Sequence, residues 1–120
     1  MRLTELPQYL NIDVRSCLEE RFMNSEELYL RFLRKLLTAQ EFKLLEQATA
    51  ANNWQEAERL AHNLKGVCAN LGLTVLQADF SSLVVLLRCE NIEAQQVRQL
   101  LEQARLDWYK TLAFIKKLED

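Results

Sequence analysis

The stretch "LAHNLKGVCANLGL", residues Leu60 to Leu73, decides the fold class and holds the only histidine of the chain. At about 100° per residue, one side of a helix through this stretch is apolar. That side carries Leu60, Ala61, Leu64, Cys68 and Leu71. The stretch therefore predicts an amphipathic helix, and Gly72 is expected to end it in the left-handed conformation.

The rest of the chain has the composition of a helical protein. Its 120 residues include only two glycines and one proline, too few for the turns of a β or α/β domain of this size. The commonest residues, such as Leu, Glu, Gln and Ala, are strong helix formers. The composition therefore favours an all-α fold.

Capping signals divide the chain into separate helices. Asp13, Ser25 and Asn53 are predicted N-caps, and Asn53 with Glu56 and Thr74 with Gln77 form two predicted capping boxes. The predicted helices span about 14–22, 26–48 with or without a pause near 38–40, 54–71, 74–87 and 92–118. The apolar stripes predict core positions at Leu28, Phe32, Leu60, Leu64, Phe80 and Leu83.

Short connections between long amphipathic helices make neighbouring helices antiparallel. The sequence predicts an antiparallel up-down four-helix bundle with short N-terminal helical additions. A single domain is expected over residues 1–120, with its core at about 12–118 and residues 1–11 as an N-terminal extension or linker.

Charge and cysteine content exclude several classes of function. The formal net charge of −2 gives no basic field for nucleic acid or an anionic membrane surface. No stretch approaches the roughly 20 apolar residues of a membrane span. Cys17, Cys68 and Cys89 are widely spaced and are predicted to be buried, reduced thiols of a cytoplasmic protein. One histidine with scattered cysteines cannot complete a zinc site, so no metal is expected.

The outer face of the predicted His62 helix carries few large side chains. Lys65, Gly66 and Ala69 lie on this face, with Glu58 beside them and Arg59 at its edge. A glycine inside a helix costs about 1 kcal/mol relative to alanine, and no core packing requires a small residue on an exposed face. This arrangement suits a histidine that receives an anion and meets a protein surface. Its alternative is an ordinary surface histidine on a bundle that only binds partners.

The segment "AHNLKGVCANLG", residues 61–72, resembles the histidine-containing phosphotransfer (HPt) domains of multistep two-component phosphorelays. The resemblance extends over about 12–115. It implies that His62 is the phosphoacceptor, that Lys65 contacts the phosphoryl group, and that Gly66 and Ala69 leave room for the partner. With Glu58 and Arg59 they form the expected docking residues.

The resemblance also implies partners. The domain would accept a phosphoryl group from a receiver-domain aspartate and pass it to a response regulator. We find no ATP-binding motif and no cluster of aspartates, so the chain is expected to carry no cofactor, with Mg²⁺ supplied by the receiver domain. A monomer is expected. The resemblance suggests the C-terminal module of a hybrid sensor histidine kinase, and the sequence leaves a free-standing protein open as the alternative.

One position departs from the family pattern. Val84 stands where the family often has Glu or Gln, so no polar helper is assigned there. Leu73, Val84 and residues before Ser25 are candidates for the apolar rim of the docking surface. A haem-binding bundle is a further alternative, which the outward direction of His62 and the lack of a second ligand oppose.

Overall fold

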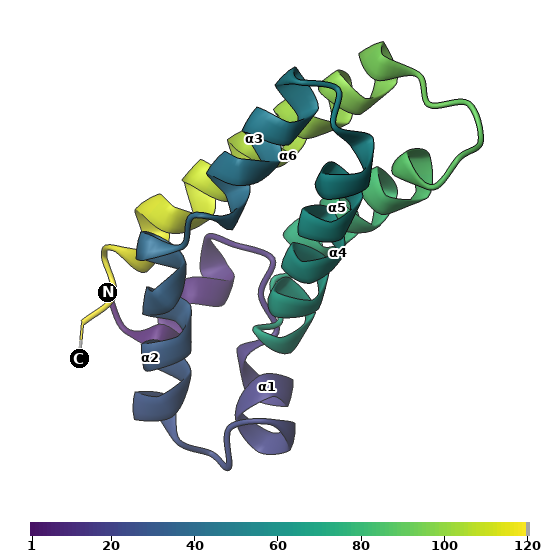
Figure 1. Ribbon diagram of the computed structural model, residues 1–120. Helices are drawn as coiled ribbons and strands as arrows, with labels where there is room; N and C mark the ends of the chain where they lie inside the picture. Colours follow the sequence, from purple (N-terminus) through teal and green to yellow (C-terminus); the bar gives the residue numbers. More distant parts are fainter. Residues whose placement is uncertain (120) are drawn as a thin grey trace.

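The computed structural model describes residues 1–119, which are helical apart from one isolated β-bridge between Ile12 and Leu73 (Figure 1). The elements are η1 (Leu3–Gln8), α1 (Val14–Glu20), α2 (Glu26–Lys35), η2 (Leu36–Thr38), α3 (Glu41–Ala50), α4 (Trp54–Asn70), α5 (Thr74–Leu87) and α6 (Ala94–Ile115). The predicted all-α class is confirmed. The first and last predicted helices are two and five residues too long, respectively.

Helices α3 to α6 form the bundle. α4 packs on α3 and α5, and α6 packs on α5 and α3. Figure 1 shows that α4 and α5 run side by side in opposite directions, with α3 and α6 along the other side. The chain pauses between α2 and α3, at η2 and residues 39–40. This pause lets α2 turn away from α3 toward α1.

Aromatic residues from three helices fill the centre of the bundle. The ring of Phe42 stacks on Trp108, with centroids 5.2 Å apart, and both rings meet the edge or face of Phe80. These residues come from α3, α6 and α5, respectively. Aromatic pairs of this kind contribute about 0.5–1.5 kcal/mol each beyond burial alone, so this cluster ties the three helices together.

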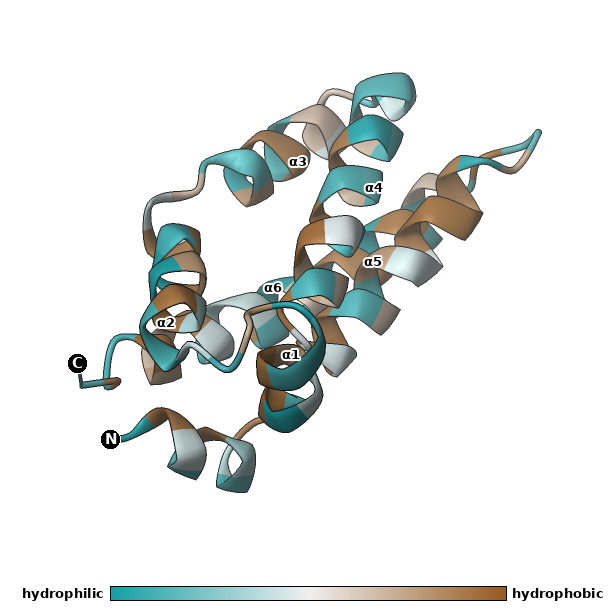
Figure 2. Cartoon of the chain, turned by 90° about the horizontal axis from the view of Figure 1, so that it is seen from below, coloured by the Kyte–Doolittle hydropathy of each residue, from teal (hydrophilic) through white to brown (hydrophobic). Residues whose placement is uncertain are grey.

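Most predicted core positions are confirmed, since Leu60, Leu64, Phe80 and Leu83 are buried. Phe32 is 40% exposed and Leu28 is half-buried, so the prediction was wrong for Phe32 and only partly met for Leu28. α2 instead turns Tyr29, Leu30 and Leu33 inward. Figure 2 shows the amphipathic helices from below, with α1 in front of the α4–α5 end of the bundle.

The three predicted N-caps are confirmed. Backbone amides donate to their side chains: Ser16 to Asp13, Leu28 to Ser25, and Glu56 to Asn53. The second capping box was wrong, because Leu73 occupies the N-cap of α5 and the Thr74 hydroxyl donates to the Asn11 carbonyl (3.0 Å) instead.

The N-terminal segment packs against the bundle. Leu3 and Leu6 are buried, and the Met1 amino group donates to the Lys117 carbonyl at 2.9 Å. The division of the chain into a core and an extension stays a prediction. The structure gives residues 1–11 extensive contacts.

The cysteines do not share one environment. Cys17 and Cys68 are buried as predicted, whereas Cys89 is exposed. α5 ends at Leu87, so Cys89 lies in the connection to α6 and not on an inward-facing helix position.

Candidate functional site

His62 lies in the middle of α4 with its side chain exposed. Neighbouring residues of α4 pack this helix against the core, because Leu60, Ala61 and Leu64 are buried. Within residues 1–119, neither the His62 imidazole nor the Lys65 ammonium forms a hydrogen bond or an ion pair. The structure therefore presents a ring whose nitrogens are available to a ligand or partner, with a half-buried lysine one turn further on.

The surface next to His62 is open at Gly66. A Cβ atom added there would meet nothing within 4 Å, apart from the helix's own nearby backbone. Gly66 therefore does not serve internal packing. Ala69, the next predicted small position, is half-buried. Together these residues leave α4 accessible on the side of the molecule where His62 lies.

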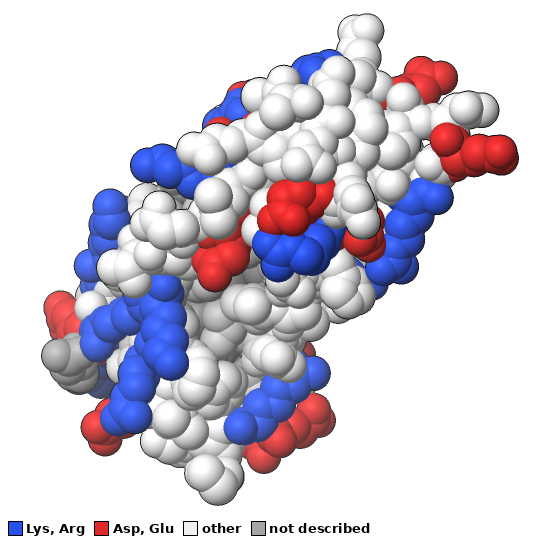
Figure 3. Space-filling model, in the orientation of Figure 1, with Lys and Arg blue, Asp and Glu red and all other residues white. Residues whose placement is uncertain are grey.

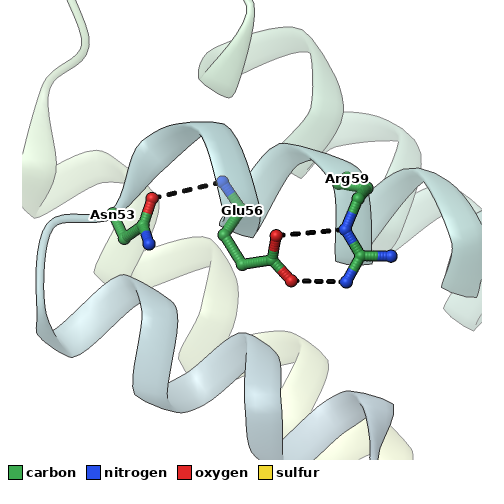
Figure 4. Close-up of polar contacts among 3 residues, drawn as sticks. All are labelled: Asn53, Glu56 and Arg59. Atoms are coloured by element: carbon green, nitrogen blue, oxygen red, sulfur yellow. Dashed lines mark hydrogen bonds and ion pairs between the residues drawn. The ribbon is translucent and has the colours of Figure 1, made fainter.

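Charged side chains one turn before His62 are paired with neighbours. Arg59 forms an ion pair and hydrogen bonds with Glu56, including an Nε–Oε2 distance of 3.0 Å (Figure 4). These hydrogen bonds lower the pKa of the Glu56 carboxyl. The Glu56 carboxylate thus accepts hydrogen bonds from Arg59. Of the predicted capping box, only the hydrogen bond from the Glu56 amide to the Asn53 side chain forms.

The other predicted docking residue before His62 is also neutralised. Glu58 accepts a hydrogen bond from Arg88, which directly follows α5, at 2.8 Å. Lys65 has no such partner in the part of the chain that the structure describes. Of the predicted charged site residues, Lys65 is therefore the cation available to a bound anion.

A groove of about 1060 Å³ runs between α2 and α4 beside the site. We call it the α2–α4 groove. Its apolar lining includes Phe22, Leu28, Phe32, Leu64, Val67 and Leu71. Asn63, the residue after His62 on α4, also lines it, so one wall of the groove is the part of α4 that carries His62. Figure 3 shows a largely uncharged surface between α2 and α4, with lysine and arginine side chains gathered over α2.

The predicted apolar rim was only partly right. Leu73 and Val84 are 2% and 3% exposed, because Leu73 joins α4 to α5 within the core and Val84 faces inward. Phe22, which precedes Ser25, lines the groove but is itself only 6% exposed. Sequence reasoning missed Val67, which is 42% exposed in the groove. Its position at the border of the apolar stripe was the available signal.

The C-terminal end of α4 is bonded to α1 and α2. The Arg21 guanidinium donates to the Ala69 carbonyl, and the Tyr29 hydroxyl donates to the Leu71 carbonyl, both at 2.5 Å. Burial raises the pKa of the Tyr29 hydroxyl well above its ordinary value. The Tyr29 hydroxyl thus gives the Leu71 carbonyl a donor at the helix end, whereas the Ala69 carbonyl also accepts from the Gly72 amide. Together the two side chains fix the end of α4 against α2 and the residue that follows α1.

Gly72 makes the tight turn after α4 possible. Its φ of +72° is the left-handed conformation that was predicted. Its carbonyl accepts a hydrogen bond from the Asp13 amide at 2.9 Å. A Cβ atom here would lie 2.7 Å from Cys17 Sγ and 2.9 Å from the Asp13 carbonyl oxygen. Only glycine fits this close approach of α1.

A family model for the Hpt domain matches residues 27–108, which include the whole of α4 and His62. The chain belongs to the Hpt domain family. The match covers all four bundle helices except the end of α6. Membership of the Hpt family indicates histidine phosphotransfer in phosphorelays and interaction with receiver or response-regulator proteins. The curated proteins and the solved structures yielded no match.

Two further observations concern residues 1–119. No helix there is both long and apolar enough to cross a membrane. No three His, Cys, Asp or Glu side chains in that range are grouped so that they could hold a metal ion.

Proposed function

We propose that this Hpt domain carries a phosphoryl group on His62, which it takes from a receiver-domain aspartate and passes to a response regulator. The observation that carries this proposal is the exposed, unbonded imidazole in the middle of α4, within the segment that the family model matches. The open space at Gly66 supports it, because a partner's active site can approach that side of the helix.

The transfer needs only a nucleophilic ring nitrogen on this chain. A neutral imidazole has one nitrogen with a free lone pair. That nitrogen attacks the phosphorus, forming a P–N bond, while the P–O bond to the partner's aspartate breaks and the carboxylate leaves with the bonding electrons. The proton on the other ring nitrogen can pass to water. The reverse sequence returns the group to an aspartate, so His62 can both accept and donate it.

Lys65 is proposed to contact the transferred group. Phosphoryl transfer proceeds through a strongly anionic transition state, so catalysis rests on positioning and cations. Lys65 is one turn from His62 and has no ion-pair partner among residues 1–119. We assign the Mg²⁺ ion and the acceptor aspartate to the receiver domain.

The receiver is proposed to dock over His62 and into the α2–α4 groove. Specific complexes bury about 1,200–2,000 Å² in total, more than a single histidine and its small neighbours supply. The groove adds apolar surface through Phe22, Leu28, Phe32 and Val67, and Asn63 joins it to the site. Apolar lining of this kind resembles the core of a protein interface, which is depleted in charge.

A labelling experiment tests the proposal. The chain is mixed with a phosphorylated receiver domain, and we expect an acid-labile, base-stable phosphate on it. His62→Gln should abolish labelling while the circular dichroism spectrum keeps its helical signal. Labelling that survives the substitution would overturn the assignment. Unchanged partner binding and signalling in that variant would instead favour a bundle that only binds partners.

Some expectations stay predictions. They are the monomeric state, the cytoplasmic location, the place of the domain at the C-terminal end of a hybrid sensor kinase, and the direction of phosphoryl flow. A profile of transfer rates against the receiver domains of the same organism would identify the partners.

A further inference from the structure

The contact between α5 and α6 contains two carboxyl groups that approach each other. Asp79 of α5 and Asp107 of α6 lie close enough to interact, and Asp107 raises the pKa of the Asp79 carboxyl. The Asp79 Oδ2 atom is shielded from solvent and has no hydrogen-bond partner among residues 1–119. Gln103 donates to Asp107 Oδ2 at 3.2 Å. Two ionised carboxylates cannot donate to each other, so a proton on one of them would make the missing hydrogen bond.

The groups around this pair do not neutralise it. α4 contributes the buried Cys68 thiol, whose pKa is raised to about 12 by burial and by the nearby Asp79. α6 contributes Lys110, which with Asp107 and Tyr9 lines a cavity of about 180 Å³. Lys110 forms no ion pair with either aspartate within residues 1–119.

The local environment therefore favours the protonated form of the pair. Burial of the carboxyl and the neighbouring Asp107 raise the pKa of Asp79 to about 7. A lone carboxyl group of an unfolded chain has a pKa of about 3.9. The folded chain thus keeps a proton that the unfolded chain releases.

We propose that Asp79 and Asp107 share one proton in the folded domain, and that its loss loosens the packing of α5 on α6. Because the folded state binds the extra proton, the free energy of unfolding falls as the pH rises from about 4 to 7 and levels off above that range. α5 packs on α4, which carries His62. This contact therefore makes the scaffold of the site sensitive to pH near neutrality, and the inference does not depend on phosphotransfer.

The test follows the Asp79 carboxyl directly. The measurements use a His62→Gln chain, which contains no histidine. We expect the carboxyl carbon resonance of Asp79 to titrate with a midpoint near 7. A midpoint near 4 would overturn the proposal, and this measurement needs no change at Asp79 itself.

A second measurement follows stability in urea between pH 5.5 and 8.5. We expect the unfolding midpoint of the His62→Gln chain to fall as the pH rises. Asp79→Asn, introduced into the His62→Gln chain, should remove most of this dependence of the urea midpoint on pH, because the asparagine amide can donate to Asp107 at every pH. Glu90→Gln, an exposed change of equal charge in the α5–α6 connection, is the matched control and should keep the slope. A slope unchanged by Asp79→Asn would contradict the shared proton.

Discussion

The two glycines of the chain should respond in opposite ways to the same substitution. Gly66 lies inside α4, is exposed, and has open space where a Cβ atom would lie. Alanine there neither clashes nor gains packing, so the difference in helix propensity decides the result. Gly66→Ala should raise the free energy of unfolding by about 0.8–1 kcal/mol.

Gly72→Ala should do the reverse. The left-handed conformation at φ +72° costs a non-glycine residue about 1–2 kcal/mol. The added Cβ atom would also meet Cys17 Sγ at 2.7 Å and the Asp13 backbone at 2.9 Å. Forcing these groups apart costs about 1–3 kcal/mol more, so the total loss should be about 2–5 kcal/mol.

Urea unfolding of both variants measures whether each substitution raises or lowers the free energy of unfolding. The rate of transfer from a phosphorylated receiver measures function. We expect Gly66→Ala to be more stable than the parent chain yet slower in transfer, because its methyl group stands where the partner approaches. Loss of stability in Gly66→Ala would refute the reasoning, since the space would then be filled by the chain itself. A more stable variant with unchanged transfer would remove Gly66 from the docking surface.

Three further substitutions test the site and its support. Val67→Glu should slow transfer from the receiver with little change in stability. Val85→Glu, at another exposed valine that lies outside the groove, should leave transfer unchanged; equal effects would argue against docking in the groove. Lys65→Ala should lower the maximal transfer rate and keep the fold, as single-turnover labelling can show. Tyr29→Phe should lower the free energy of unfolding by about 1–3 kcal/mol, because the buried Leu71 carbonyl loses its donor. An unchanged urea midpoint would mean that water replaces the hydroxyl.

Most features that depend on neighbours in sequence were predicted correctly, although the capping box at Thr74 was not. The caps at Asp13, Ser25 and Asn53 each act on an amide three residues away. Gly72 ends α4 as expected. The outward direction of His62 also follows from helical periodicity, because the apolar stripe of α4 had to face the core.

Features that depend on how the helices are arranged were not predicted. Phe32 belongs to an apolar stripe, yet it lines a groove because the break at residues 36–40, between α2 and α3, turns α2 away from the bundle. Val84 stands beside the expected site but faces inward. The close approach of Asp79 to Asp107 joins two helices whose relative rotation no local pattern determines.

The sequence by itself determined the helices, their capped ends, the apolar stripes and the exposed position of His62, since these depend on contacts within about four residues. Only the tertiary structure decided which stripe residues lie against another helix and which line the α2–α4 groove. It also decided that Arg21 and Tyr29 hold the end of α4, and that two carboxyls meet between α5 and α6. The physical reason is that burial and electrostatic pairing depend on distances between segments far apart in the chain, which only packing sets.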